Sequence, residues 1–172
     1  AVLTRTLLRH ATDRAERAEL HGVLAARAAL AGLREEALAA AREEVAHYRE
    51  LAWADPVEHR PALADALSDL ALRHLAVGRP EDALYASEEA VELWRAVTAE
   101  DDDCTPQLAN ALDQLSRRHA ALGRRAEAMA AIGEASDLYR DLAAAHPALF
   151  RVDLARITDR AAALAESAGG DQ

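Results

Sequence analysis

Apolar side chains recur at three- and four-residue spacing along most of the chain, and short polar segments interrupt this pattern at regular intervals. Such spacing is typical of amphipathic helices that bury one face. The interruptions centre on Gly32, Gly78 and Gly123, which lie 46 and 45 residues apart. Glycine readily adopts the left-handed backbone conformation that ends many helices. We therefore predict helix ends within about three residues of each of these glycines.

The residues that follow each glycine repeat as well. An acidic residue, an alanine and a large apolar residue come in fixed order, and an aromatic residue followed by arginine recurs further along: Glu36-Ala37-Leu38, Asp82-Ala83-Leu84, Glu127-Ala128-Met129, Tyr48-Arg49, Trp94-Arg95 and Tyr139-Arg140. Self-similarity at this period is typical of helical solenoids, in which each unit buries its core against its neighbours. The predicted fold is therefore all-α: a right-handed α-solenoid of about seven antiparallel helices, without strands.

The repeat divides the chain into three and a half units of two helices each, which we expect to form one domain over residues 1–172. The units are expected at residues 10–55, 56–100 and 101–146, with a terminal half-unit at 147–168. Residues 1–8 leave two alternatives open, because they suit either the tail of a preceding helix or an extension of the first one. The chain opens directly into a helical pattern, which suggests a piece of a longer protein.

Helix starts and stops are predicted from capping residues. In the second unit, Pro61 suits the first turn of a helix, where the N–H that proline lacks has no intrahelical partner in any case. In the third unit, Thr105 is expected to cap a helix whose first turn holds Pro106. Gly169 and Gly170 are expected to end the last helix.

The predicted core is made of slim helices in close approach. About a quarter of the residues are alanine and only six are aromatic, so bulky side chains cannot fill the interior. At the repeated alanine positions a larger side chain would overpack the layer between helices. We therefore predict that the following alanines are buried: Ala83, Ala90, Ala128 and Ala135.

Charge excludes some classes of partner. All 20 basic residues are arginine, which indicates a GC-rich bacterial genome, and 30 acidic residues give a formal net charge of −10. Nucleic-acid binding needs a basic stripe that neutralises phosphates; none is visible, so we expect no nucleic-acid partner. The chain has neither an apolar run of about 18 residues nor a signal-peptide pattern, and we expect a cytoplasmic protein without membrane contact. Cys104 is the single cysteine, which precludes an internal disulfide.

The chain resembles the tetratricopeptide repeat family, in the long-period variant common in actinobacterial proteins. The resemblance covers nearly the whole chain and rests on a leucine pair with a small residue in the first helix, the turn glycine, and small residues in the second helix. The residues that carry it, besides the glycines, are Leu67, Leu70, Ala71, Leu112, Leu115, Ser116, Ala83, Ala90, Ala128 and Ala135. The family's usual repeat is about 34 residues, so these units are longer by about eleven. Histidine and arginine replace the family's usual tyrosine and closing proline at His74, His119, Arg95 and Arg140.

The resemblance implies a concave groove, lined mainly by the first helix of each unit, that binds a protein or peptide. The groove residues it implies are Asp65, Ser68, Asp69, Leu72, Asn110, Asp113, Gln114, Arg117, Arg156, Asp159 and Arg160. We expect a non-catalytic interaction scaffold. The alternatives are a regulatory or sensor array of a larger signalling ATPase or transcription regulator and, third, a helical enzyme. Self-association is left open.

The groove arginines indicate what a partner would carry. A guanidinium pairs bidentately with a carboxylate, so we expect Arg117, Arg156 and Arg160 to receive an acidic segment or a free C-terminus. The competing interpretation is an internal salt-bridge network of little binding value. The aspartates that would neutralise the arginines in that network are Asp113, Asp153 and Asp159.

Three further sets of residues are candidates for chemistry. The acidic run at residues 100–103 lacks the spaced ligands of a calcium loop, and we expect a solvated loop there. Glu44 and His47 have the spacing of half a di-iron carboxylate site, but without the other half we expect a surface pair. His74 and His119 occupy equivalent positions and are expected to pack against a neighbouring helix. With no catalytic motif in the chain, we expect no catalytic residue, metal ion or cofactor.

Overall fold

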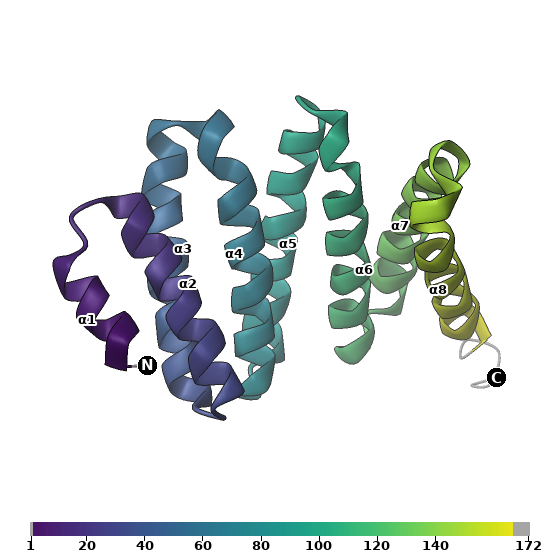
Figure 1. Ribbon diagram of the computed structural model, residues 1–172. Helices are drawn as coiled ribbons and strands as arrows, with labels where there is room; N and C mark the ends of the chain where they lie inside the picture. Colours follow the sequence, from purple (N-terminus) through teal and green to yellow (C-terminus); the bar gives the residue numbers. More distant parts are fainter. Residues whose placement is uncertain (1, 167–172) are drawn as a thin grey trace. The chain divides into compact units, whose positions relative to one another are not determined.

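The computed structural model describes residues 2–166 (Figure 1). These residues form eight α-helices and one short 3₁₀ helix, without a strand. The α-helices are α1 (Val2–His10), α2 (Arg14–Leu30), α3 (Arg34–Ala54), α4 (Pro56–Ala76), α5 (Pro80–Thr98), α6 (Thr105–Ala121), α7 (Arg125–Ala145) and α8 (Pro147–Glu166), and the 3₁₀ helix is η1 (Asp102–Cys104). The predicted all-α solenoid of helix pairs is confirmed, whereas its right-handed sense stays a prediction.

The chain forms two compact units, Ala1–Leu93 and Trp94–Gln172, which are described separately and called unit 1 and unit 2. In unit 1, α3 packs against both α2 and α4, and α1 contacts α2 (Figure 1). In unit 2, α7 packs against both α6 and α8. The expected single domain over residues 1–172 stays a prediction.

The three repeated glycines end α2, α4 and α6, as predicted. Gly32, Gly78 and Gly123 have positive φ angles of 74°, 76° and 71°, and no other described residue has a positive φ. In each turn the N–H of the residue after the glycine donates to a carbonyl five residues earlier, as in a Schellman motif. These hydrogen bonds run from Leu33 to Ala28 (2.9 Å), from Arg79 to His74 (3.0 Å) and from Arg124 to His119 (2.9 Å).

Helix α4 begins at Pro56, so the start predicted near Pro61 is wrong. The carboxylate of Asp55 accepts a hydrogen bond from the backbone N–H of Glu58 at 3.2 Å and caps the helix, and Pro56 stands at its first position. Pro61 therefore lies inside the helix and leaves the carbonyl of Val57 without its intrahelical donor. Val57 is exposed, so solvent can bond to this carbonyl instead.

Thr105 is the first residue of α6, so the prediction that it caps the helix is wrong. The η1 helix runs directly into α6 and places Cys104 at the cap position, without a side-chain hydrogen bond. The hydroxyl of Thr105 instead donates to the carbonyl of Asp102 at 2.6 Å. Asp101 caps η1 by accepting from the N–H of Asp103 at 3.0 Å, so part of the expected loop is helical.

Residues 2–10 form a helix of their own, which excludes an extension of the first predicted helix and raises the helix count from about seven to eight. Asp13 separates the two helices: its backbone is extended, and its carboxylate caps α2 by accepting from the N–H of Glu16 at 3.2 Å. Arg27 of α2 holds α1 in place by donating to the hydroxyl of buried Thr4 at 3.1 Å. The expected helix end at Gly169-Gly170 lies outside the described residues.

The core follows the predicted pattern. All four repeated alanines are at most 1% exposed, which confirms the prediction. His74 and His119 are buried, as expected for packed side chains. His74 lies 3.4 Å from the carboxylate of Asp82, which raises its pKa, but burial is the larger effect and the net shift is downward.

The repeated arginine after the aromatic residue links alternate helices. In unit 1, Arg49 of α3 donates two hydrogen bonds to Glu89 of α5, at 3.2 and 2.5 Å. In unit 2, Arg95 of α5 makes the same pair with Glu134 of α7, at 3.3 and 2.6 Å. The third arginine, Arg140, pairs with Asp137 on its own helix.

Candidate partner-binding faces

The predicted groove residues of unit 1 lie along α4. Asp65, Asp69 and Leu72 are exposed, and Ser68 is half-buried. The hydroxyl of Ser68 donates to the carbonyl of Ala64 in its own helix at 3.0 Å. This side chain is therefore turned onto the backbone, which leaves the carboxylates as the main polar groups of this face.

Glu44 of α3 joins these carboxylates, and we call Glu44, Asp65 and Asp69 the acidic face. Burial and the negative charges of Asp69 and Asp65 together raise the pKa of Glu44 to about 7, against the opposing effect of Arg73. Burial and the charge of Asp69 also raise the pKa of Asp65. These shifts mean that a further negative charge is disfavoured at this face.

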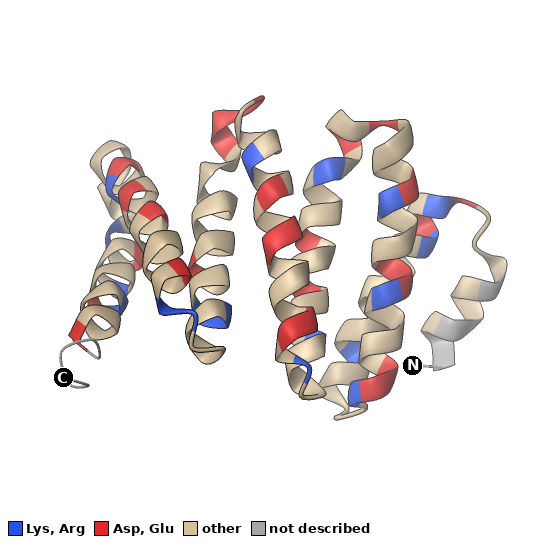
Figure 2. Cartoon of the chain, turned by 180° about the vertical axis from the view of Figure 1, so that it is seen from behind, with Lys and Arg blue, Asp and Glu red and all other residues tan. Residues whose placement is uncertain are grey.

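Unit 1 carries more acidic residues on α5. Figure 2 shows them recurring along the helix, at Glu81, Asp82, Glu88, Glu89 and Glu92. The electrostatic field of unit 1 thus favours cationic groups over anionic ones near α5.

The groove residues of unit 2 come from α6 and α8. Asn110, Gln114 and Arg117 lie on α6, exposed or half-buried, and Asp159 of α8 is exposed. Asp113 differs from all of them because its side chain is only 2% exposed. The helical spacing alone predicted a solvated position for it.

Three guanidinium groups converge on Asp113. One carboxylate oxygen, Oδ2, accepts from Arg156 at 2.5 Å and from Arg117 at 3.1 Å. The other oxygen, Oδ1, forms an ion pair with Arg160. Arg156 also donates to Asp153 at 3.2 Å. We call Arg117, Arg156 and Arg160, around Asp113, the arginine cluster.

The arginine cluster keeps positive charge at the surface. The side chains of Arg117, Arg156 and Arg160 are 48%, 37% and 28% exposed. Asp113 and Asp153 neutralise two of the three charges, so one remains. If buried Arg118 and exposed Asp159 are counted as well, one positive charge still remains.

The arginine cluster therefore has features of both interpretations of the arginines, the internal salt-bridge network and the partner-binding face. Asp113 and Asp153 do pair with them, as an internal network requires. The guanidinium groups nevertheless reach solvent, as a binding face requires. Burial lowers the pKa of Arg160, but an arginine side chain stays charged in proteins.

Unit 2 also contains a cavity of about 710 Å³, which the repeat pattern of the sequence did not predict. Leu138, Leu142 and Phe150 line it, and Asp102 and Asp141 lie at the same cavity. Concave sites with a mainly apolar lining commonly hold apolar groups of a ligand.

Comparisons with known proteins agree with this architecture. A family model described as the bacterial transcriptional activator domain matches residues 61–149, just over half of the chain and the part that runs from α4 into α8. No match was found among curated proteins.

One solved structure shows a similar fold. The crystal structure of aspartyl phosphate phosphatase F from Bacillus subtilis is 16% identical, with a TM-score of 0.61. The match covers 95% of this chain but only 44% of the phosphatase. The crystal structure of MamA protein is 15% identical, with a TM-score of 0.33 over 91% of this chain and 97% of that one. The likeness to the phosphatase shows a helical-repeat fold and carries no function across. Among the described residues, no helix combines the length and apolarity needed to cross a membrane.

Proposed function

This chain belongs to the bacterial transcriptional activator domain family, and we propose that it is a non-catalytic helical-repeat module that binds a protein segment for a bacterial transcription regulator. Family membership favours the regulatory array over a general scaffold. The tetratricopeptide resemblance supports the same proposal, because stacked helix pairs present extended surfaces to proteins and peptides.

The observation that carries the proposal is the arginine cluster. Asp113 is buried and holds three guanidinium groups from two helices at fixed positions. Groups that are already ordered lose less side-chain entropy when a partner binds. A guanidinium also matches the planar geometry of a carboxylate. The partner that fits this face is an acidic segment or a C-terminal carboxylate.

Arg117 is the best-placed residue to make the first contact. Its Nη2 atom donates a hydrogen bond to Asp113, and a guanidinium has five N–H donors in all. Nearly half of its side chain is exposed. The remaining donors can therefore bind a partner carboxylate without breaking the bond to Asp113.

Binding of a labelled polyglutamate peptide, measured by fluorescence anisotropy, tests the proposal. The double variant Arg117→Gln/Arg156→Gln should weaken binding by about tenfold or more, since it removes two charge-assisted contacts. A matched double variant, Arg124→Gln/Arg140→Gln, removes the same charge from the N-cap of α7 and from the C-terminal half of that helix, and it should leave binding nearly unchanged. Binding by the wild type should also weaken as salt is raised.

Two outcomes would overturn the proposed binding face. One is equal loss of affinity in the two double variants, which would show that only net charge matters. The other is equal binding of a polyglutamine peptide of the same length, which would show that carboxylates are not recognised. Circular dichroism of each variant establishes that the helices are intact.

A further inference from the structure

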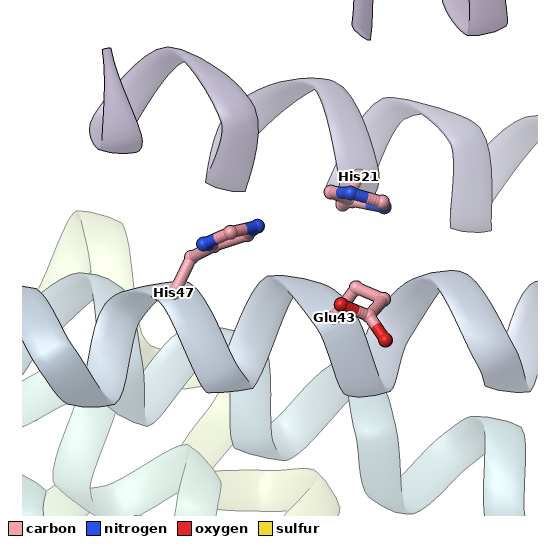
Figure 3. A group of neighbouring side chains, drawn as sticks. All are labelled: His21, Glu43 and His47. Carbon is pink, nitrogen blue, oxygen red and sulfur yellow. The ribbon is translucent and has the colours of Figure 1, made fainter. Parts of the chain in front are cut away.

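Two histidines and one glutamate converge in unit 1, outside the region that the family model matches (Figure 3). His21 comes from α2, and Glu43 and His47 come from α3, one helical turn apart on the same face. One ligand atom of each side chain lies within 4.8 Å of the others. The rings of His21 and His47 lie with their centroids 5.5 Å apart and are tilted by 32°.

This combination of atoms has the chemistry of a zinc site. Imidazole nitrogen and carboxylate oxygen bind Zn²⁺ at about 2.0–2.2 Å. Tetrahedral geometry then places ligand atoms roughly 3.4 Å apart. The spacing of up to 4.8 Å therefore has to close by up to about 1.4 Å, which side-chain rotations can supply because Glu43 is exposed and both histidines are only half-buried.

We propose that His21, Glu43 and His47 form a binding site for a divalent ion of the zinc type, with one ligand atom from each residue and a fourth position open to water. Three protein ligands with an open position are a common arrangement for zinc. Imidazole-rich sets of this kind also disfavour Mg²⁺ and Ca²⁺, which prefer oxygen ligands.

A second observation comes from His21 itself. Its Nδ1 atom is buried and has no hydrogen-bond partner among the described residues. A buried polar atom without a partner is uncommon and needs an explanation. A bound ion would either be coordinated by Nδ1 itself or be coordinated by Nε2, in which case Nδ1 carries the proton.

The charges around His21 are consistent with an ion at this position. The charged or titratable groups that act on its ring are His47, Glu43 and Arg17. Arg17 opposes a bound cation, and the carboxylate of Glu43 offsets it.

The site was not visible in the sequence because its first ligand lies 22 residues before Glu43 on another helix. The sequence instead paired His47 with Glu44. Glu44 belongs to the acidic face, and its carboxylate lies against Gly22, where a β-carbon would collide with it. The proposal revises the expectation that the chain holds no metal ion, and it does not depend on the proposed function.

Titration of the purified chain with zinc chloride, followed by isothermal calorimetry, tests the site. We expect one ion per chain with a dissociation constant in the micromolar range. His47→Ala and Glu43→Gln should each weaken binding by about tenfold or more. His146→Ala removes an exposed histidine of unit 2 and should leave binding unchanged. Substitution with Co²⁺ should give the visible absorption bands of tetrahedral coordination in the wild type and not in His47→Ala.

The measurement also distinguishes binding from a folding defect. Glu43→Gln is nearly isosteric at an exposed position, so without zinc its unfolding temperature should equal that of the wild type. Addition of Zn²⁺ should raise the unfolding temperature of the wild type but not that of Glu43→Gln. Equal zinc binding in wild type, Glu43→Gln and His47→Ala would overturn the proposal. So would the absence of saturable binding at millimolar zinc in the wild type.

Discussion

Ser68 of α4 and Asp113 of α6 stand 45 residues apart, at the same position of two successive repeats. In unit 1 the hydroxyl of Ser68 turns back onto its own helix. In unit 2 the carboxylate of Asp113 is buried and gathers three arginines. Four residues later the repeat has Leu72 in one unit and Arg117 in the other.

The difference shows how one helical scaffold carries two electrostatic faces. The alanines and glycines that set helix packing are the same in both units, at 0% exposure for both Ala83 and Ala128. The polar positions differ between the units, and in unit 2 one of them, Asp113, is itself buried and pairs α6 with α8. In unit 1, burial and the nearby carboxylates of Asp69 and Asp65 raise the pKa of Glu44 to about 7. In unit 2, the arginine cluster keeps one guanidinium charge more than the carboxylates that pair with it.

The largest effect is expected from removing the centre of the arginine cluster. Asp113→Ala should lower the free energy of unfolding by about 3 kcal/mol, because it leaves partly buried arginines without their shared counter-charge. Ser68→Ala, the equivalent change in unit 1, should cost about 1 kcal/mol or less, because one hydroxyl bond to the helix backbone is lost. Urea denaturation followed by circular dichroism measures both. Equal costs would show that Asp113 does not organise the cluster.

A second prediction tests whether the scaffold is indeed common to both units. Ala83→Leu and Ala128→Leu should each lower the free energy of unfolding by about 2 kcal/mol, because added methylenes overpack a closed layer. Ala126→Leu, at an exposed position of α7, serves as the control and should change it by about 0.5 kcal/mol or less. An unchanged denaturation midpoint for either buried position would mean that its layer is looser than the structure shows.

The smallest effect concerns the acidic face and depends on pH. The pKa of Glu44 is about 7 when folded, above its ordinary 4.5. Its ionisation therefore destabilises the fold progressively as pH rises from 4.5 to 7 and fully above that. Glu44→Gln should stabilise the protein by about 1 kcal/mol at alkaline pH, after allowance for solvent screening, and by much less at acidic pH.

The control for this pH dependence is Glu92→Gln, an exposed acid on α5. Its effect on the free energy of unfolding should vary less between the two pH values than that of Glu44→Gln. A stabilisation by Glu44→Gln that is the same at both pH values would show that burial and the neighbouring carboxylates do not raise the pKa of Glu44 in solution.

Much of the fold could be predicted from the sequence because its signals are local and repeated. Gly32, Gly78 and Gly123 mark helix ends through a backbone conformation that glycine adopts at low cost. The predicted start of α4 was wrong because Pro56 and Pro61 both suit the first turn of a helix. The carboxylate of Asp55 caps the helix so that it begins at Pro56.

The candidate sites were harder to predict because they depend on contacts between helices. Helical spacing placed Asp113 one turn off the core, but it cannot show that α8 brings two arginines over it. In the same way, no spacing rule joins His21 to Glu43 and His47 on the next helix. Burial of a polar side chain is set by its neighbours in space, and a single sequence does not list them.

The central claim is that an acidic ligand binds the arginine cluster of unit 2 and not the acidic face of unit 1. Amide chemical shifts of the isotope-labelled chain, recorded by NMR during titration with polyglutamate peptide, test it most directly. We predict that the largest changes fall on α6 and α8 around Asp113, Arg117 and Arg156, and that added salt reverses them. Changes of equal size on α4 around Asp65 and Asp69, or no saturable change on α6 and α8, would contradict the claim.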